Sequence, residues 1–246
     1  MERAVFDRMA ELDQNHWWFT ARRRILAEVI RRIVRLPANA RILELGCGTG
    51  HNLGMLGGFG SVEASELDDH ARAMAAKRLG RPIEKAALPD LSMFPADSYD
   101  LVALLDVLEH VVDDKGSLKA VFTRLKPGGA LLLTVPINPW MWSAHDVAHH
   151  HHRRYRKREI AALATDSGFE IELLSPFNSL LFPLIAGARA WGRLRGHDSA
   201  DDVMPPKPLN AALDRIFGLE AALIGRLPFP FGVSLVAVLR RPSANA

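Results

Sequence analysis

The sequence lacks three features that would each place the chain in a particular class of proteins. Cys47 is the one cysteine among 246 residues, so no disulfide can form within the chain and oxidative folding is not implied. The formal net charge is only +3, which does not by itself indicate nucleic-acid binding, and we predict no nucleic-acid partner. No run reaches the roughly 18 uninterrupted apolar residues that a membrane-spanning helix requires.

The start of the chain lacks a further feature, because residues 1–7, MERAVFD, contain no apolar core of a secretory signal peptide. Together these absences predict a cytoplasmic protein and leave peripheral contact with a membrane open. The chain is, however, rich in hydrophobic residues. Hydrophobic residues make up 48% of it, which is enough for one large α/β domain with a sizeable core.

The most informative segment is an apolar run that ends in three glycines. Residues 42–45 have strand character, and Gly46, Gly48 and Gly50 follow at every second position. Glycine lets a ligand approach the backbone closely, and a strand that leads through such a loop into a helix is typical of nucleotide sites. Dinucleotide binders favour G-x-G-x-x-G, whereas this loop reads G-x-G-x-G and follows Glu44. A carboxylate there suits a positively charged ligand better than a diphosphate.

A second acidic position lies about 20 residues further on, where doubly wound folds place the acid that holds a ribose diol. There the next expected strand ends in Glu66, followed by Leu67, Asp68 and Asp69. A carboxylate can accept two hydroxyl hydrogen bonds at once, and charged acceptors make the stronger bonds. We predict that Glu66 has this role. Asp68 and Asp69 are expected to begin the next helix, where acids complement the helix dipole.

Strands and helices are expected to alternate along most of the chain. Apolar runs predict strands at residues 42–45, 61–65, 82–84, 100–105, 130–135, 169–174 and 233–239. Helical patterns are expected at residues 19–35, 52–59, 70–79, 117–125 and 158–167. Most arginines of the first helix, which include Arg22, are expected to lie on a solvated face. Such βα alternation predicts a parallel, doubly wound sheet.

The segment after the fourth expected strand carries further polar residues. It reads DVLEH at residues 106–110, and ligands of such sheets bind beyond the carboxyl ends of the strands. Together with the glycine loop, YDLV at 99–102 and LKPGG at 125–129, it resembles class I S-adenosylmethionine-dependent methyltransferases. The nearest resemblance is to bacterial small-molecule enzymes related to the quinone C-methyltransferases. It covers roughly residues 40 to 136 and is specific for the fold and the cofactor, not for the methyl acceptor.

The resemblance implies an α/β fold that is Rossmann-like and doubly wound, with a mostly parallel seven-stranded sheet whose last strand is antiparallel. It implies S-adenosyl-L-methionine as the cofactor, with its methionine end on the glycine loop and its ribose on Glu66. The residues implied to bind it are Trp18, Glu44, Gly46, Cys47, Gly48, Gly50, Glu66, Leu67, Ala87 and Asp106. Many relatives carry an adenine-binding acid after strand three. This chain has Ala86 and Ala87 there, so backbone groups or Asp90 would have to serve.

A histidine-rich loop follows the fifth expected strand, where this fold builds acceptor pockets. The resemblance narrows there to a bacterial subgroup, at WSAHD (142–146) and HHRRY (151–155). His110, His145 and His151 are the candidate catalytic residues, because an imidazole titrates near neutrality and could deprotonate an acceptor. The alternative is a polar loop that orders a lid. No metal site is predicted from the four consecutive histidines, because adjacent side chains diverge and zinc sites space their ligands.

The segment before the last strand is a helical insert that is longer than an ordinary loop. Residues 177–191 are mostly apolar but too short to span a bilayer, and a second helical segment covers residues 209–227. The two segments could pack on each other as a cap or form a homodimer face. They could also make peripheral membrane contact as a lid for a lipophilic acceptor.

We therefore predict one methyltransferase domain that transfers a methyl group to a small-molecule or lipid-linked acceptor. Its expected parts are an N-terminal helical cap (1–36), a cofactor-binding core (40–175), the helical insert (177–227) and the last strand (232–241). The alternatives are an NAD-binding oxidoreductase, which the loop spacing disfavours, and a non-catalytic cofactor-binding regulatory module. A sulfonium is already a potent donor, so alignment and charge placement can supply much of the acceleration. The sequence therefore does not distinguish O-, N- and C-methylation.

Overall fold

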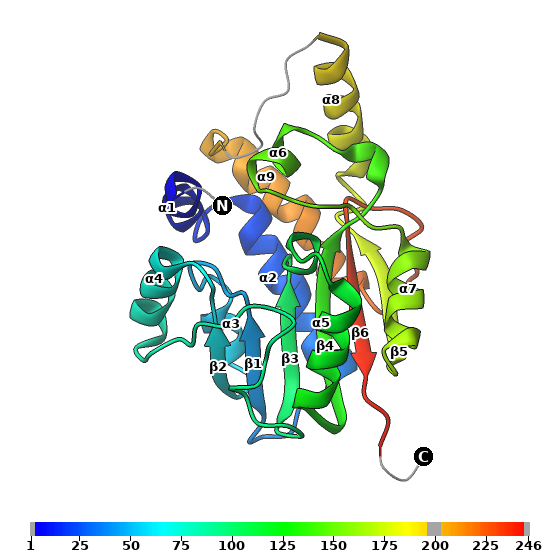
Figure 1. The fold of residues 1–246 in the computed structure, drawn as a ribbon. Coiled ribbons are helices and arrows are strands. Elements are labelled where there is room, and N and C mark those ends of the chain that lie inside the picture. Colours follow the sequence, from blue (N-terminus) through cyan, green and yellow to red (C-terminus); the bar gives the residue numbers. More distant parts are fainter. Residues whose placement is uncertain (1–2, 196–202, 244–246) are drawn as a thin grey trace.

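The structure is a computed structural model that describes residues 3–195 and 203–243. Among these residues one sheet has six strands in the order β2-β1-β3-β4-β6-β5 (Figure 1). They are β1 (Arg41–Leu45), β2 (Ser61–Ser65), β3 (Tyr99–Leu105), β4 (Leu125–Pro136), β5 (Glu170–Phe177) and β6 (Ser234–Arg240). β1 to β4 run parallel, whereas β6 pairs antiparallel with β4 and β5. The predicted Rossmann-like, mostly parallel α/β fold with an antiparallel last strand is confirmed.

The sheet has one strand fewer than the seven predicted. Residues 82–84 make only an isolated parallel bridge, in which Glu84 pairs with Ser65 at the end of β2. The Glu84 N–H donates to the Ala64 carbonyl, and the Glu66 N–H donates to the Glu84 carbonyl. The proline that opens the segment has no N–H with which to extend the ladder. The segment therefore lengthens the sheet beyond β2 without forming a strand of its own.

Helices cover both faces of the sheet, because its central strands are apolar on both sides. Along β3, Leu101, Ala103 and Leu105 enter one core cluster, and Val102 and Leu104 enter the other. The helices on the Val102 side are α5 (Asp114–Arg124) and α7 (Lys157–Asp166). Those on the opposite side are α2 (Trp17–Val29), the π-helical η1 (Ile30–Val34), α3 (Leu53–Gly57), α4 (Asp69–Leu79), α9 (Lys207–Gly218) and α10 (Glu220–Leu223).

The remaining elements gather at the carboxyl edge of the parallel strands (Figure 1). They are α1 (Arg3–Leu12), η2 (Leu108–His110), η3 (Pro139–Met141), α6 (Ala144–Ala148) and α8 (Phe182–Arg195). In doubly wound sheets this edge carries the ligand site. None of the described helices is long and apolar enough to cross a bilayer.

The turn from β2 into α4 shows how the sequence sets the geometry of this edge. The Asp68 carboxylate accepts hydrogen bonds from the His70 and Ala71 N–H groups and so caps the first turn of α4. Gly80, with a φ of +73°, ends the helix. The prediction that Asp68 and Asp69 begin this helix is confirmed. The cap leaves Glu66 as the acid at the end of β2.

The segment between β5 and β6 divides into two unlike parts. α8 projects beyond the carboxyl edge (Figure 1), whereas α9 and α10 pack on α2 and join a layer of the core. Phe217 of α9 is fully buried, with ring contacts to Trp17 and Phe177. The Thr20 hydroxyl of α2 donates to the Asp214 carboxylate of α9. This differs from the expectation that the two helical segments pack on each other, because the apolar face of α9 is buried against α2.

Candidate functional site

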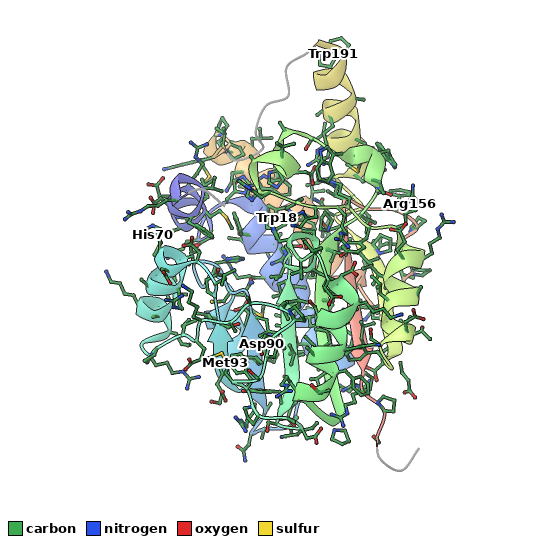
Figure 2. All side chains as sticks on the ribbon, viewed as in Figure 1. Trp18, His70, Asp90, Met93, Arg156 and Trp191 are labelled. Atoms are coloured by element: carbon green, nitrogen blue, oxygen red, sulfur yellow. The ribbon has the colours of Figure 1, made fainter. Side chains whose placement is uncertain are left out.

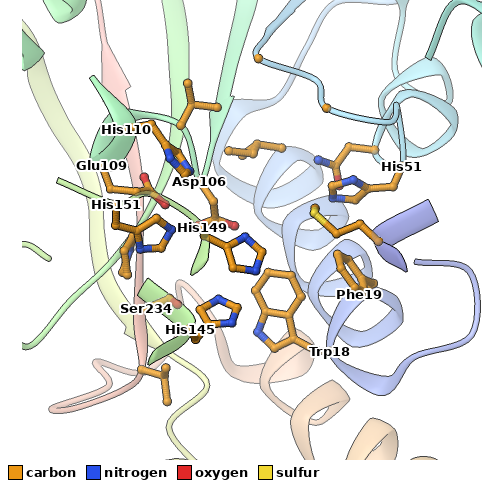
Figure 3. A pocket seen from close by; sticks show the side chains of 18 of the residues that line it. Trp18, Phe19, His51, Asp106, Glu109, His110, His145, His149, His151 and Ser234 are labelled. Carbon is orange, nitrogen blue, oxygen red and sulfur yellow. The ribbon is translucent and has the colours of Figure 1, made fainter. Parts of the chain in front are cut away.

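A cavity of about 1400 Å³ opens at the carboxyl edge of the sheet. Its walls come from the loops after β1, β2, β3 and β4, from α1 and α2, and from α8. Figure 3 shows His51 and Phe19 on one side of it, His110 and His151 on the other, and Trp18 between them. The cavity therefore brings together segments that are far apart in the sequence, including all the loops singled out above.

The glycine loop after β1 forms one part of the wall, and its three glycines have positive φ values between +56° and +83°. The Cys47 N–H donates to the Ser65 carbonyl over 2.9 Å, which ties the loop to β2. A Cβ added at Gly46 would lie 2.8 Å from a methyl carbon of Val107, so the loop after β3 fills that space. At Gly48 an added Cβ would meet no protein atom within 4 Å. Gly48 therefore leaves open space beside the backbone, as a loop that a ligand must approach requires.

Three of the residues predicted to hold the methionine end are buried. Glu44 and Gly50 are not among the residues that line the cavity, and Gly50 leaves room for Ala75 of α4. One carboxylate oxygen of Glu44 accepts a hydrogen bond from the Asn52 amide, and the other has no hydrogen-bond partner among the described residues. Burial raises the pKa of Glu44 to about 7. Burial also raises the pKa of the Cys47 thiol, which makes it an unreactive part of the loop.

Glu66 lines the cavity and is held by the backbone. Its two carboxylate oxygens accept hydrogen bonds from the Gly48 N–H, at 2.7 Å, and from the Asp68 N–H, at 2.9 Å. Each oxygen keeps a further lone pair, because a carboxylate oxygen can accept more than one hydrogen bond. The side chain is only 9% exposed. The arrangement suits the predicted contact with a ribose diol.

The neighbouring wall is largely apolar where adenine recognition was predicted. Leu67 and Ala87 both line the cavity, and the Leu67 side chain is 55% exposed at its rim. Asp90 is exposed, does not line the cavity, and accepts a hydrogen bond from the Ser92 N–H. Of residues 85–91, those that line the cavity are apolar, and the carboxylates nearest to this wall are those of Asp68 and Asp69 after β2.

Asp106, which follows β3, faces a buried arginine that the sequence analysis assigned to a solvated face. A carboxylate oxygen of Asp106 lies 2.6 Å from Arg22 Nη2, and the other accepts a hydrogen bond from the Thr134 hydroxyl. The Arg22 side chain is 1% exposed, and its guanidinium lies 5.1 Å from the ring centroid of Trp18. Arg22 was missed although it precedes the buried residues Ile25, Leu26 and Val29 at helical spacing. That spacing is the signal that would have found it.

Four histidines gather on the wall opposite the glycine loop. The rings of His110 and His151 meet edge to face with centroids 4.7 Å apart, and those of His145 and His149 lie 4.1 Å apart (Figure 3). His145 and His151 are 6.1 Å apart. The three predicted catalytic histidines are thus neighbours, and His149 joins them although the sequence analysis did not single it out. Burial, together with His151 and His149, lowers the pKa of His110 to about 4, so this imidazole is neutral.

Asp146 of α6 holds this histidine cluster in place. Its fully buried carboxylate accepts from Arg154 Nε at 2.7 Å and lies 2.9 Å from His151 Nδ1. It also accepts a hydrogen bond from the Ser143 N–H at the start of α6. Burial favours the neutral carboxyl, but the hydrogen bond of His151 and the charge of Arg154 outweigh it and lower the pKa of Asp146. Asp146 is therefore an anion that orients the His151 ring.

The architecture and the loop motifs can be compared with known proteins. A sequence model of the family described as "Methyltransferase domain" matches residues 18–174, well over half of the chain. The chain belongs to this methyltransferase family. The predicted family and the cofactor, S-adenosylmethionine, are thereby confirmed.

Curated relatives of this methyltransferase differ in what their names describe. A ubiquinone biosynthesis O-methyltransferase of Xanthomonas axonopodis pv. citri is 28% identical over 162 residues, covering 56% of this chain and 66% of the relative. An S-adenosyl-L-methionine-dependent Diels-Alderase of Talaromyces variabilis is 33% identical over 119 residues, covering 45% of this chain and 41% of the relative. The methyltransferase therefore matches less than two thirds of the length of either relative.

Solved structures agree with the fold of this methyltransferase. A chain in the Haloferax volcanii complex of the Trm112 methyltransferase activator superposes with a TM-score of 0.63 at 17% identity, covering 97% of this chain and 96% of that one. The geranyl diphosphate C-methyltransferase of Streptomyces coelicolor, solved with S-adenosylhomocysteine, has a TM-score of 0.60 at 15% identity. That match covers 88% of this chain and 78% of the other. At such identities the likeness shows the fold alone.

Proposed function

We propose that the protein transfers a methyl group from S-adenosylmethionine to a small-molecule acceptor that has a lipophilic part. The main observation that supports this proposal is the size of the cavity. Its volume of about 1400 Å³ exceeds the ~300–1,000 Å³ of ordinary ligand pockets. It extends from Gly48 and Glu66 past the histidine cluster to α8. One cavity of this size has room for a cofactor and an acceptor side by side.

The cofactor would lie at the end of the cavity formed by the glycine loop. In the proposal Glu66 accepts the ribose hydroxyls with its remaining lone pairs, and the backbone beside Gly48 lies along the methionine end. Glu44, behind the loop, would support the loop through its hydrogen bond with Asn52 rather than contact the cofactor, because it does not line the cavity. Asp106 and Trp18 would border the sulfonium from the opposite side, since both line the same cavity. These roles place the methyl group toward the histidines.

Among the candidate bases, His151 has the best orientation for acting on an acceptor. Its Nδ1 is bound to the Asp146 carboxylate, which fixes the ring proton on that nitrogen and leaves a lone pair on Nε2. His110, with its lowered pKa of about 4, is a weaker base. We therefore propose His151 as the group that faces the reacting atom, with His110 and His145 shaping its surroundings.

The acceptor is proposed to be partly lipophilic because α8 supplies an apolar wall. Leu184, Ile185 and Ala188 line the cavity from this helix, and Leu181 lines it just before the helix begins. Leu184 is 63% exposed, and Trp191, near the tip of α8 in Figure 2, is 58% exposed. The geranyl diphosphate acted on by one structural neighbour is a ligand of this kind, with an apolar chain and a polar end. Peripheral membrane contact or a homodimer through the insert would use the same exposed side chains.

A product assay tests the proposal. The protein is incubated with methyl-labelled S-adenosylmethionine and separate lipophilic and aqueous fractions of a bacterial extract, and S-adenosylhomocysteine and labelled product are measured. We expect label in an organic-soluble product. Leu184→Glu should raise the KM for that acceptor at least tenfold, whereas Leu219→Glu should not, because Leu219 is 60% exposed and does not line the cavity. Cofactor binding without any S-adenosylhomocysteine formation would favour a role like that of the Diels-Alderase or of a regulatory module.

A further inference from the structure

Glu109, His110 and His151 form a cluster that the account of methyl transfer leaves unexplained. One oxygen or nitrogen atom from each of the three side chains lies within 4.8 Å of the other two. Glu109 and His110 belong to η2 after β3, and His151 belongs to the loop after α6. Figure 3 shows the Glu109 carboxylate beside the His151 ring, with His110 next to it. The three side chains come from two separate loops, so they can converge on one point. The side chains of four consecutive histidines, in contrast, diverge.

Glu109 is the most unusual member of the cluster. It is 1% exposed, and neither of its carboxylate oxygens has a hydrogen-bond partner among the described residues. A buried carboxylate without a partner is costly. A cation between Glu109 and the two imidazoles would offset that cost.

We propose that Glu109, His110 and His151 bind one divalent transition-metal ion on the acceptor side of the cavity. Two imidazoles and one carboxylate are a donor set that favours zinc and its first-row neighbours over magnesium or calcium. In a zinc site the ligand bonds are about 2.0–2.2 Å long, so the three groups would have to close by roughly 1 Å. Three protein ligands leave a coordination position open for an acceptor. All three residues line the cavity, so that position can be reached from it.

The surroundings of the cluster support this assignment. Metal-binding histidines usually donate their other ring N–H to a carboxylate, which fixes the tautomer. His151 has this arrangement, because its Nδ1 lies 2.9 Å from the buried Asp146 carboxylate. His110 stands beside His151, because the two rings meet edge to face with centroids 4.7 Å apart. The charges of Arg22 and Arg154 oppose a cation, but each is paired, with Asp106 and Asp146 respectively.

A metal ion here would change how the acceptor is activated. It would take the Nε2 lone pair of His151 and would itself polarise a hydroxyl or carbonyl oxygen of the acceptor. A hydroxyl bound to such an ion would release its proton to solvent water near neutral pH, as metal-bound water does. The sulfonium would then meet an anionic oxygen without a strong protein base. This consequence rests on the proposed methyl transfer, whereas the ion site itself does not.

Metal binding can be measured without cofactor or acceptor, so it is independent of the proposed reaction. Tag-free protein is treated with EDTA, dialysed and titrated with ZnCl2 by calorimetry, and with CoCl2 by visible absorption. We expect one equivalent of Zn2+ per chain, a cobalt spectrum, and a thermal midpoint that Zn2+ raises. Glu109→Gln should weaken Zn2+ binding at least tenfold and abolish the thermal shift.

His152→Ala is the matched control, because His152 is the exposed neighbour of His151 and contacts Glu109 only through its backbone N–H. It should bind Zn2+ like the parent. Equal Zn2+ binding by the parent and Glu109→Gln would overturn the proposal, since the ion would then be held by the run of histidines. No Zn2+ binding by the parent at 100-fold molar excess would overturn it too. His110→Asn, which keeps Glu109, gives a second variant should Glu109→Gln fail to fold.

Discussion

The three glycines of the loop after β1 have different roles at the scale of single residues. Gly48 has open space beside it, whereas a side chain at Gly46 would collide with Val107. We predict that Gly48→Ala lowers the affinity for S-adenosylhomocysteine at least tenfold, with a stability loss of only about 1–2 kcal/mol from its positive φ. Gly46→Ala should lose more stability, because its Cβ has no room. Calorimetric titration and urea unfolding of both variants check this. Parent-like binding by Gly48→Ala would show that the cofactor does not approach the loop there.

Glu44 should make stability depend on pH. The folded protein raises the pKa of this fully buried carboxyl from its ordinary 4.5 to about 7, so the folded state holds a proton that the unfolded chain has released. The free energy of unfolding should therefore fall as pH rises from about 4.5 to 7, by about 3 kcal/mol. Glu44→Gln should remove this part of the slope. Urea unfolding of both proteins between pH 4.5 and 8 measures the difference, and parallel profiles would contradict it.

The place of a single residue could be predicted from the sequence where its residue type has one characteristic role at that spacing. The glycine spacing located the loop beside the cavity, and the distance to Glu66 located a second acid on the same wall. Burial and partners could not be predicted in this way. Glu44 lies behind the wall, and Arg22 is buried rather than solvated, because its neighbours come from β3 and β4. Only the folded chain brings those partners together.

At the scale of elements, Glu220 joins α10 to the turn after β5. Its fully buried carboxylate accepts hydrogen bonds from the N–H groups of Asn178, Ser179 and Leu180, at 2.7, 2.6 and 2.9 Å. Glu220→Ala would leave two buried donors, the N–H groups of Asn178 and Ser179, and the part-buried N–H of Leu180 without an acceptor, and each buried loss costs about 1–3 kcal/mol. We predict a destabilisation of about 3 kcal/mol or more, measured by urea unfolding. Glu220→Gln, which keeps one acceptor, should lose less. Parent-like stability of Glu220→Ala would show that α10 is not held there.

The sequence predicted most of the strands and helices, but not which elements pack against one another. Long apolar runs located β1 to β6, because strands buried on both faces leave a strong pattern, although β4 begins at Leu125 and not at the predicted residue 130. The segment at 82–84 has too few residues for such a pattern, and it forms only a bridge. The apolar stripe of α9 showed that the helix buries one face, but not that α2 is the element that covers it. Choice of partner depends on the whole topology. The domain boundaries within the chain therefore stay a prediction.

At the scale of the whole molecule, one cavity joins a cofactor end, a histidine cluster and an apolar wall. The glycine loop and Glu66 come from β1 and β2, the histidines from the loops after β3 and β4, and the apolar wall from α8. The α/β sheet brings the first two parts together because its parallel strands end at one edge. α8 extends the cavity beyond that edge and supplies its apolar wall.

The central claim is that this cavity holds S-adenosylmethionine with its ribose on Glu66, and calorimetric titration with S-adenosylhomocysteine tests it most directly. We predict one site per chain in the parent protein and no binding of NAD. Glu66→Ala should weaken binding by about 1.5–3 kcal/mol, roughly 10- to 150-fold, the loss expected for a charged hydrogen-bond partner. Glu84→Ala, an exposed acid at the same sheet edge that does not line the cavity, should bind like the parent. Equal affinity of the parent and Glu66→Ala, or tighter binding of NAD than of S-adenosylhomocysteine, would contradict the account.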